Sequence, residues 1–196
     1  MILRMVLLLS LVLCFTPLAA QEMVDSRSAL TSVQSAFVQE KHLPILARPI
    51  ISKGRFIFQA PASLRWEYFS PLPSVLLMDG GRTRKFVSHD GVFQEEHGMG
   101  VDSMAVVLQE ISGWLDGRIT DTPTFRAESV GENRIVLTPK EEALRQIISR
   151  IELKLVDSSG LMESVTIYEG KDSFTRMVFS DAVINGKIAA GVFQKP

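Results

Sequence analysis

The stretch SLRWEYFSP, residues 63–71, carries the clearest strand pattern in the sequence. Leu64, Trp66 and Tyr68 fall on one face of a strand, because successive side chains of a strand point to opposite faces. The charged Arg65 falls on the other face. The alternation predicts a strand that turns one face to an apolar interior and the other to water.

Turn sequences separate this strand from others of the same kind. Asp79-Gly80 and Asp90-Gly91 are typical of tight hairpin turns, because glycine accepts the positive φ that such turns require. Pro44 and Pro49, within residues 41–61, favour an edge or bent strand there, ahead of a strand that begins after Gly54. The strands expected are 55–59, 64–68, 74–78, 82–87, 92–95, 124–130, 134–138, 147–156, 161–169, 174–180 and 190–194. Together they predict one long antiparallel sheet that curls.

Two segments show the spacing of amphipathic helices instead. In residues 25–37, apolar side chains follow a capping-type start at Asp25. In residues 102–115, apolar side chains including Trp114 recur every three or four positions, and Gly117 ends the pattern. We expect the second helix to cover the concave face of the curled sheet.

The first twenty residues have the layout of a secretory signal peptide. Arg4 precedes an apolar run, and the small pair Ala19-Ala20 follows Pro17. We therefore expect cleavage after Ala20 and a single mature domain over residues 21–196. Cys14, the only cysteine, lies in the leader, so the mature chain is expected to have no disulfide and no thiolate nucleophile.

Charge and motif content argue against nucleic-acid binding and against catalysis. Removing Arg4 from 21 basic residues leaves 20 against 22 acidic ones, so the mature chain is nearly neutral, and neither nucleic acid nor an anionic membrane surface is expected as its main partner. His42, His89 and His97 are far apart and lack a second ligand at metal-binding spacing. No nucleophile elbow, phosphate loop or zinc-protease motif occurs. We expect no enzyme activity, no metal and no cofactor.

Several motifs, in their order and spacing, resemble one family of carrier proteins. They are FVQEK at 37–41, SKGRFIFQAPASLRWEY at 52–68, Pro71, Asp79-Gly80 and RIVLTPK at 134–140. This series resembles the outer-membrane lipoprotein carrier protein family, LolA, through most of the mature chain.

The resemblance implies a mainly β fold with a helical lid: an unclosed antiparallel half-barrel of about ten or eleven strands covered by short helices. It also implies a monomeric periplasmic chaperone whose hydrophobic cavity holds the acyl chains of lipoproteins. Such a carrier would take lipoproteins from an inner-membrane ABC transporter and pass them to an outer-membrane receptor, without a cofactor.

One position departs from the family pattern. Where the resemblance implies an arginine that tethers the lid, Ala60 precedes Pro61. Lid control must therefore differ or fall to another residue such as Arg65. This departure keeps an alternative open, in which the chain carries or senses another lipid, such as a polyketide or a glycolipid.

The candidate ligand-binding residues combine the alternating strand positions with the predicted helix. We expect the cavity to be lined by Phe56, Phe58, Leu64, Trp66, Tyr68, Val75, Leu77, Met104, Val107, Leu108, Ile111 and Leu115. The competing interpretation is an ordinary packed core, because alternation identifies the apolar face but not whether space remains there. A protein-binding regulator and a lipid-ester hydrolase are the other functional alternatives.

Overall fold

The regular secondary structure in the described part of the chain is almost entirely β-strand. The computed structural model describes residues 30–97, 110, 114, 121–156, 161–169 and 172–196. The strands are β1 (Ser32–His42), β2 (Ile50–Gln59), β3 (Ser63–Ser70), β4 (Ser74–Asp79), β5 (Arg82–His89), β6 (Val92–Glu96), β7 (Phe125–Ser129), β8 (Arg134–Pro139), β9 (Arg150–Leu155), β10 (Met162–Tyr168) and β11 (Phe174–Ile184). The short helix α2 (Glu142–Arg145) lies between β8 and β9. None of the helical segments in the described residues has the length and apolar character of a membrane span.

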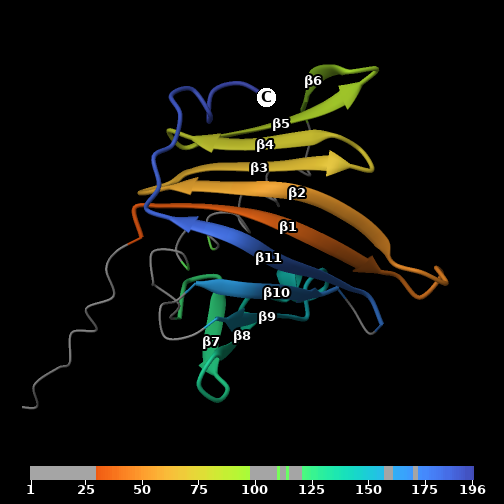
Figure 1. Ribbon diagram of the computed structural model, residues 1–196. Coiled ribbons are helices and arrows are strands. Elements are labelled where there is room, and N and C mark those ends of the chain that lie inside the picture. The colour runs from red at the N-terminus through yellow and green to blue at the C-terminus, as the bar shows by residue number, and fades with distance from the viewer. Residues whose placement is uncertain (1–29, 98–109, 111–113, 115–120, 157–160, 170–171) are drawn as a thin grey trace, which may run out of the picture.

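All of these strands pair antiparallel in a single sheet. Its order is β6-β5-β4-β3-β2-β1-β11-β10-β9-β8-β7, so two meanders meet where β1 pairs with β11 (Figure 1). Strands β6 and β7 form the two edges and do not pair with each other. The prediction of an unclosed antiparallel sheet of about ten or eleven strands is confirmed, with eleven strands in the described part of the chain.

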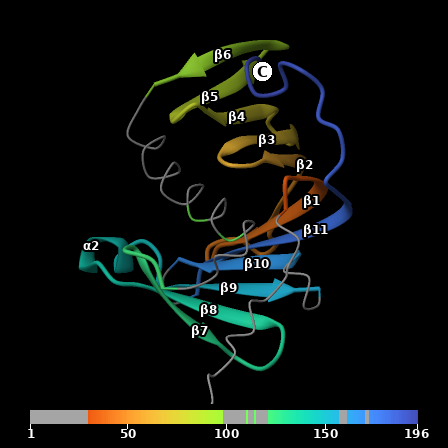
Figure 2. The ribbon, with the colours of Figure 1, turned by 90° about the vertical axis from the view of Figure 1, so that its left-hand side faces the viewer.

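The sheet is strongly curved, and its concave face carries the main core. Figure 2 shows the strands from β6 to β7 following an arc. Strand alternation puts apolar residues from both meanders on this face, among them Leu64 and Phe58 from one half and Leu137 and Leu153 from the other. The core is therefore shared between strands that are distant in the sequence.

The predicted helix over residues 25–37 is wrong from Ser32 onward, where β1 begins. Val33 and Phe37 are four positions apart, a spacing that fits one face of a helix and one face of a strand equally well. The residue between them on the strand face is Ser35, a buried polar side chain whose hydroxyl donates to the carbonyl of Ser180 at 2.7 Å. This serine concealed the strand alternation. Residues 25–29 lie outside the described residues.

Two other expectations on strands need correction. The edge strand expected near the prolines is instead the central strand β2, which starts at Ile50 and pairs with both β1 and β3. Pro44 and Pro49 lie in the preceding connection, where their missing N–H groups cost no ladder bond. The strand expected at 190–194 is replaced by turns, which include a hydrogen bond from the Gln194 amide to the Gly191 carbonyl.

Candidate functional site

Aromatic side chains form the centre of the concave face. The aromatic cluster consists of Phe37 from β1, Phe56 from β2, Trp66 and Tyr68 from β3, and Phe179 from β11. The ring centroid of Phe37 lies 4.9 Å from that of Trp66 and 5.2 Å from that of Tyr68, the latter edge-to-face. Phe37 therefore joins the two meanders, because it also meets Phe179 at 6.4 Å.

Gly54 makes room for the Phe37 ring. It is opposite Phe37 in the β1–β2 register and opposite Tyr68 in the β2–β3 register. A Cβ at this position would lie 2.6 Å from Cζ of Phe37 and 2.0 Å from the carbonyl oxygen of Glu67. No side chain fits there, so the glycine lies within β2 for a packing reason. The sequence pattern predicts Gly54 as the residue before a strand and gives no sign of this packing role.

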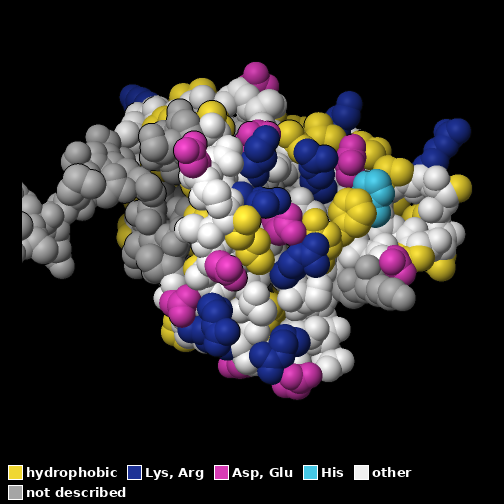
Figure 3. Space-filling model, turned by 90° about the horizontal axis from the view of Figure 1, so that it is seen from below, with side chains coloured by type: hydrophobic (Ala, Val, Ile, Leu, Met, Phe, Trp, Pro, Cys, Tyr) yellow, Lys and Arg dark blue, Asp and Glu magenta, His cyan; other side chains and the backbone are white. Residues whose placement is uncertain are grey.

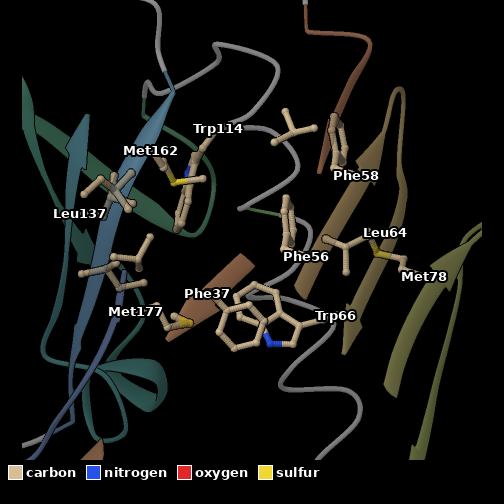
Figure 4. Packing of buried hydrophobic residues seen from close by; sticks show 14 of the residues in the cluster. Phe37, Phe56, Phe58, Leu64, Trp66, Met78, Trp114, Leu137, Met162 and Met177 are labelled. Carbon is tan, nitrogen blue, oxygen red and sulfur yellow. The ribbon is translucent and has the colours of Figure 1, made fainter. Parts of the chain in front are cut away.

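The strand residues predicted to line a cavity are largely brought together. Phe56, Phe58, Leu64 and Trp66 are buried on the concave face, with the half-buried Tyr68 packed against them. Figure 4 shows the side chains from β2 and β3 pointing toward Trp114, Leu137, Met162 and Met177 from the other side of the face. The shared location agrees with the prediction, whereas their lining of a ligand cavity stays a prediction.

Val75 and Leu77 are an exception and lie on the outer face. In the β3–β4 register, Leu76 is opposite Trp66 and Met78 is opposite Leu64, so these two residues take the concave positions. Val75 and Leu77 pack with Phe86 and Phe93 in a separate cluster. The sequence VLLM is apolar without alternation because β4 is buried on both faces. The sequence therefore does not indicate which of these residues lie on the concave face.

Two residues of the predicted helix, Glu110 and Trp114, have described positions, and Trp114 lies on the concave face. Trp114 is 1% exposed and belongs to the concave-face core. Its indole N–H is buried and finds no hydrogen-bond acceptor among the described residues. The predicted lining residues on this segment, Met104, Val107, Leu108, Ile111 and Leu115, lie outside the described residues.

Arg65 lies on the outer face, as the alternation predicts, but it is not in water. Its side chain is only 7% exposed. Its Nε donates to Glu67 at 2.9 Å, and its Nη1 donates to the carbonyls of Val192 and Lys195 at 3.0 and 2.6 Å. The chain after β11 therefore covers this face of β3. Among the described residues, Arg65 has no contact that supports the predicted control of a lid on the concave side.

Glu67 is the anionic partner in this outer network. Arg55 Nε also donates to it, at 2.6 Å, so one carboxylate joins two guanidinium groups. Burial acts to raise the pKa of Glu67, but the hydrogen bonds and charges of Arg65 and Arg55 outweigh it and hold the pKa below its ordinary value. The carboxylate is consequently ionised at neutral pH and fixes the outer side of β2 and β3.

The concave face is closely packed within the described residues. The pocket described there has a volume of about 20 Å³, which is room for about one water molecule. It is lined by Val33, Ser35, Phe56, Leu161, Met162, Phe179 and Ala182.

Polar chemistry on the concave face is limited. Burial raises the pKa of Tyr68 to about 12, and its hydroxyl donates to Oε1 of Gln39 at 2.7 Å.

Within the described ranges, no group of three or more His, Cys, Asp or Glu side chains is placed to hold a metal ion. His42 lies beside Glu40 and stacks on Phe174, while His89 and His97 are exposed.

Comparison with known proteins assigns the family. Residues 28–196 match the family of the outer membrane lipoprotein carrier protein LolA. The chain belongs to the LolA family. This match extends from just before β1 to the last residue, so it includes every strand of the curved sheet. The comparison with curated proteins gives no match.

Solved structures similar to this LolA-family chain have low sequence identity. A DUF1329 family protein from Desulfovibrio piger is 12% identical, with 87% of this chain and 92% of that chain covered and a TM-score of 0.48. A LolA superfamily protein from Nitrosomonas europaea is 14% identical, with 85% and 91% covered and a TM-score of 0.42. The complex of MucA and MucB from Pseudomonas aeruginosa is 18% identical, with 84% and 56% covered and a TM-score of 0.39. The family assignment rests on the sequence match.

Proposed function

We propose that this LolA-family chain is a periplasmic carrier that holds the acyl chains of lipoproteins against the concave face. It would receive them from an inner-membrane ABC transporter and deliver them to an outer-membrane receptor, as a monomer after cleavage of the leader at Ala20. The observation that carries the proposal is an apolar, aromatic-centred face inside an unclosed sheet, in a chain whose family is that of a lipoprotein carrier.

Moving an acyl chain through water requires an apolar surface that shields it. Each methylene removed from water contributes about 0.8 kcal/mol, so a single chain of about sixteen carbons loses on the order of 12 kcal/mol on exposure to water. A free acylated protein would therefore not cross an aqueous compartment at a useful rate. Contacts between apolar groups are non-directional, so hydrocarbon can take the place of side chains on the concave face.

We propose that acyl chains enter by displacing Trp114. Its unsatisfied indole N–H makes burial on this face less favourable, because a buried donor without an acceptor loses its hydration. Met162 and Met177 lie on the same face, and their unbranched side chains can repack around a ligand.

Intrinsic fluorescence and a charge substitution test this function. The chain has two tryptophans, Trp66 and Trp114, and both lie on the concave face, so loading with a purified lipoprotein should change the emission. Leu64→Glu places a charge on this face and should abolish lipoprotein binding. Val38→Glu, on the partly exposed outer side of β1, is the matched control and should bind normally. Normal binding by Leu64→Glu with an intact β-sheet spectrum would contradict the proposal.

A second candidate function differs from the first in the lipid that is bound. Ala60, in place of the arginine implied by the family pattern, favours a carrier or sensor of another lipid, such as a polyketide or a glycolipid. Native mass spectrometry of the protein purified from the periplasm separates the two. A bound lipoprotein supports the first function, and a bound free lipid of defined mass supports the second. Lipoproteins retained at the inner membrane after depletion of the chain would support the first.

A further inference from the structure

We propose that the connection between β1 and β2 is a membrane-contact element that inserts into the surface of an anionic phospholipid bilayer. We call residues 43–52 the β1–β2 tip. The tip extends beyond its neighbours: β1 pairs with β11 only as far as His42, and β2 pairs with β3 only from Lys53 onward. Figure 1 shows this connection projecting past the ends of the other strands. Residues 43–49 of the tip therefore have no neighbouring strand in the described part of the chain.

The tip exposes large apolar side chains. Ile45 is 88% exposed, and Leu46, Ile50 and Ile51 are each more than 40% exposed. Ile50 and Ile51 are consecutive and point to opposite faces, so neither face of the ribbon is protected. The connection between β3 and β4, at the same end of the sheet, adds the exposed Leu72. Clustered apolar exposure of this kind marks an interaction site.

Charge favours a bilayer as the occupant. The sequence has no acidic residue between Lys41 and Glu67, whereas Arg48 and Lys53 lie within and beside the tip. Both cations are exposed, and neither forms an ion pair with a described residue. Figure 3 shows hydrophobic and cationic side chains together at the right-hand margin, where the tip projects. Cations beside apolar groups complement anionic headgroups above an acyl region.

The backbone of the tip also suits a membrane interface. Pro44 and Pro49 have no N–H group, and the Leu46 N–H donates to the Leu43 carbonyl at 3.0 Å. These features reduce the number of main-chain donors that would lose water when the tip enters the boundary between headgroups and acyl chains. This inference goes beyond the proposed cargo-binding function, because no tip residue belongs to the hydrophobic core of the concave face.

Vesicle binding by the mature protein tests the inference. We expect co-sedimentation with vesicles of phosphatidylcholine and phosphatidylglycerol, and weaker binding to phosphatidylcholine alone. Ile45→Asp should lower the affinity by about tenfold or more, because an apolar anchor is lost and a repelling charge is gained. Val156→Asp, an exposed apolar position after β9, should bind like the unmodified protein. Equal losses in both variants, or no binding of the unmodified protein, would overturn the inference.

A second pair of variants tests how much the cations of the tip contribute to vesicle binding. Arg48→Ala with Lys53→Ala should weaken binding to the anionic vesicles and flatten its salt dependence. Arg126→Ala with Arg134→Ala, on the β7–β8 hairpin, removes the same charge and should leave both unchanged. If the tip variants bind bare vesicles normally but lose transfer from vesicles that contain the transporter, the partner is a protein and the bilayer assignment is wrong.

Insertion itself can be measured with a single label. Since Cys14 lies in the predicted leader, Ile45→Cys would give the mature chain one reactive thiol. An environment-sensitive dye at this position should shift to the blue on vesicles, and the same dye at Val156→Cys should not. An unshifted dye at position 45 would overturn the inference. Lipoprotein binding by Ile45→Asp should be normal, so failure of this inference and failure of the carrier function are distinguishable.

Discussion

The two faces of β3 are both covered, but by different physical means. On the concave side, Leu64 and Trp66 contact other apolar and aromatic side chains. On the outer side, Arg65 is held by Glu67 and by main-chain carbonyls of the segment after β11. One strand thus separates a face of non-directional contacts from a face of charge-assisted hydrogen bonds.

This difference fits a protein that must rearrange on one side alone. Apolar contacts keep much of their free energy when one hydrocarbon group replaces another, because the hydrophobic effect depends on area rather than direction. The bonds of Arg65 depend on distance and angle and would be lost by a small shift. The outer network can therefore hold the sheet in place while side chains on the concave face exchange with a ligand.

The largest effect is expected from Phe37→Ala on the concave side. Phe37 is 2% exposed and contacts three members of the aromatic cluster across the junction of the two meanders. Its truncation should lower the free energy of unfolding by about 4 kcal/mol, measured by urea denaturation. Val38→Ala, on the opposite side of β1, should cost far less. Equal effects would mean that the cluster does not hold the halves together.

Gly54→Ala should follow, with a loss of about 3 kcal/mol from overpacking. The added Cβ would meet the Glu67 carbonyl, a backbone atom that can move only with β3. Gly186→Ala is a suitable control, because its Cβ would approach a Val183 methyl group rather than backbone. Thermal or urea unfolding of both variants checks the difference. A Gly54→Ala protein as stable as the control would show that Phe37 and β3 can shift apart freely.

Arg65→Met tests the outer face and should cost about 2 kcal/mol, because two carbonyls and part of Glu67 lose a charged donor. Limited proteolysis should then cut the segment after β11 faster. Arg84→Met is the control, because Arg84 makes one bond to this segment, to the Gln194 carbonyl, at a more exposed position. Lipoprotein binding by Arg65→Met should be normal. Loss of lipoprotein binding would show that a change on the outer face alters the concave face, so the two faces would not be independent.

The sequence was most informative where a strand has one apolar face and a glycine turn. The Leu64-Trp66-Tyr68 face and the turns at Asp79-Gly80 and Asp90-Gly91 were predicted correctly. It was least informative where both faces are buried. In β4 the apolar run does not indicate which residues face the concave side, so Leu76 was missed and its neighbours Val75 and Leu77 were chosen instead.

Register between distant strands could not be predicted either. The contact of Phe37 with Phe179 depends on the pairing of β1 with β11, which are separated by most of the chain. Ser35 hid the β1 alternation because its hydroxyl is satisfied by a carbonyl that is remote in sequence. The covering of Arg65 likewise depends on where the segment after β11 returns. These contacts depend on the tertiary structure, so they cannot be predicted from the pattern of neighbouring residues in the sequence.

The smallest expected effect concerns Glu67 and pH. Its pKa is lowered in the folded protein, so its ionised form contributes stability above the ordinary value of 4.5, and this contribution is lost as the pH falls through the lower folded value. Between pH 6 and pH 3, the unmodified protein should lose more stability than Glu67→Gln, by about 1 kcal/mol or less, since the network is partly exposed. Urea unfolding across this range measures the difference.

Glu132→Gln on the exposed β7–β8 turn removes one carboxylate elsewhere and should leave the pH profile of the unmodified protein in place. If Glu67→Gln also retained that profile, the acid response would arise outside the outer network. In that case Arg65 would be held in place by its bonds to the carbonyls after β11, and the charge of Glu67 would contribute little to stability. A flatter profile for Glu67→Gln alone would instead identify this carboxylate as the ionic centre of the outer face, opposite the aromatic cluster on the same strands.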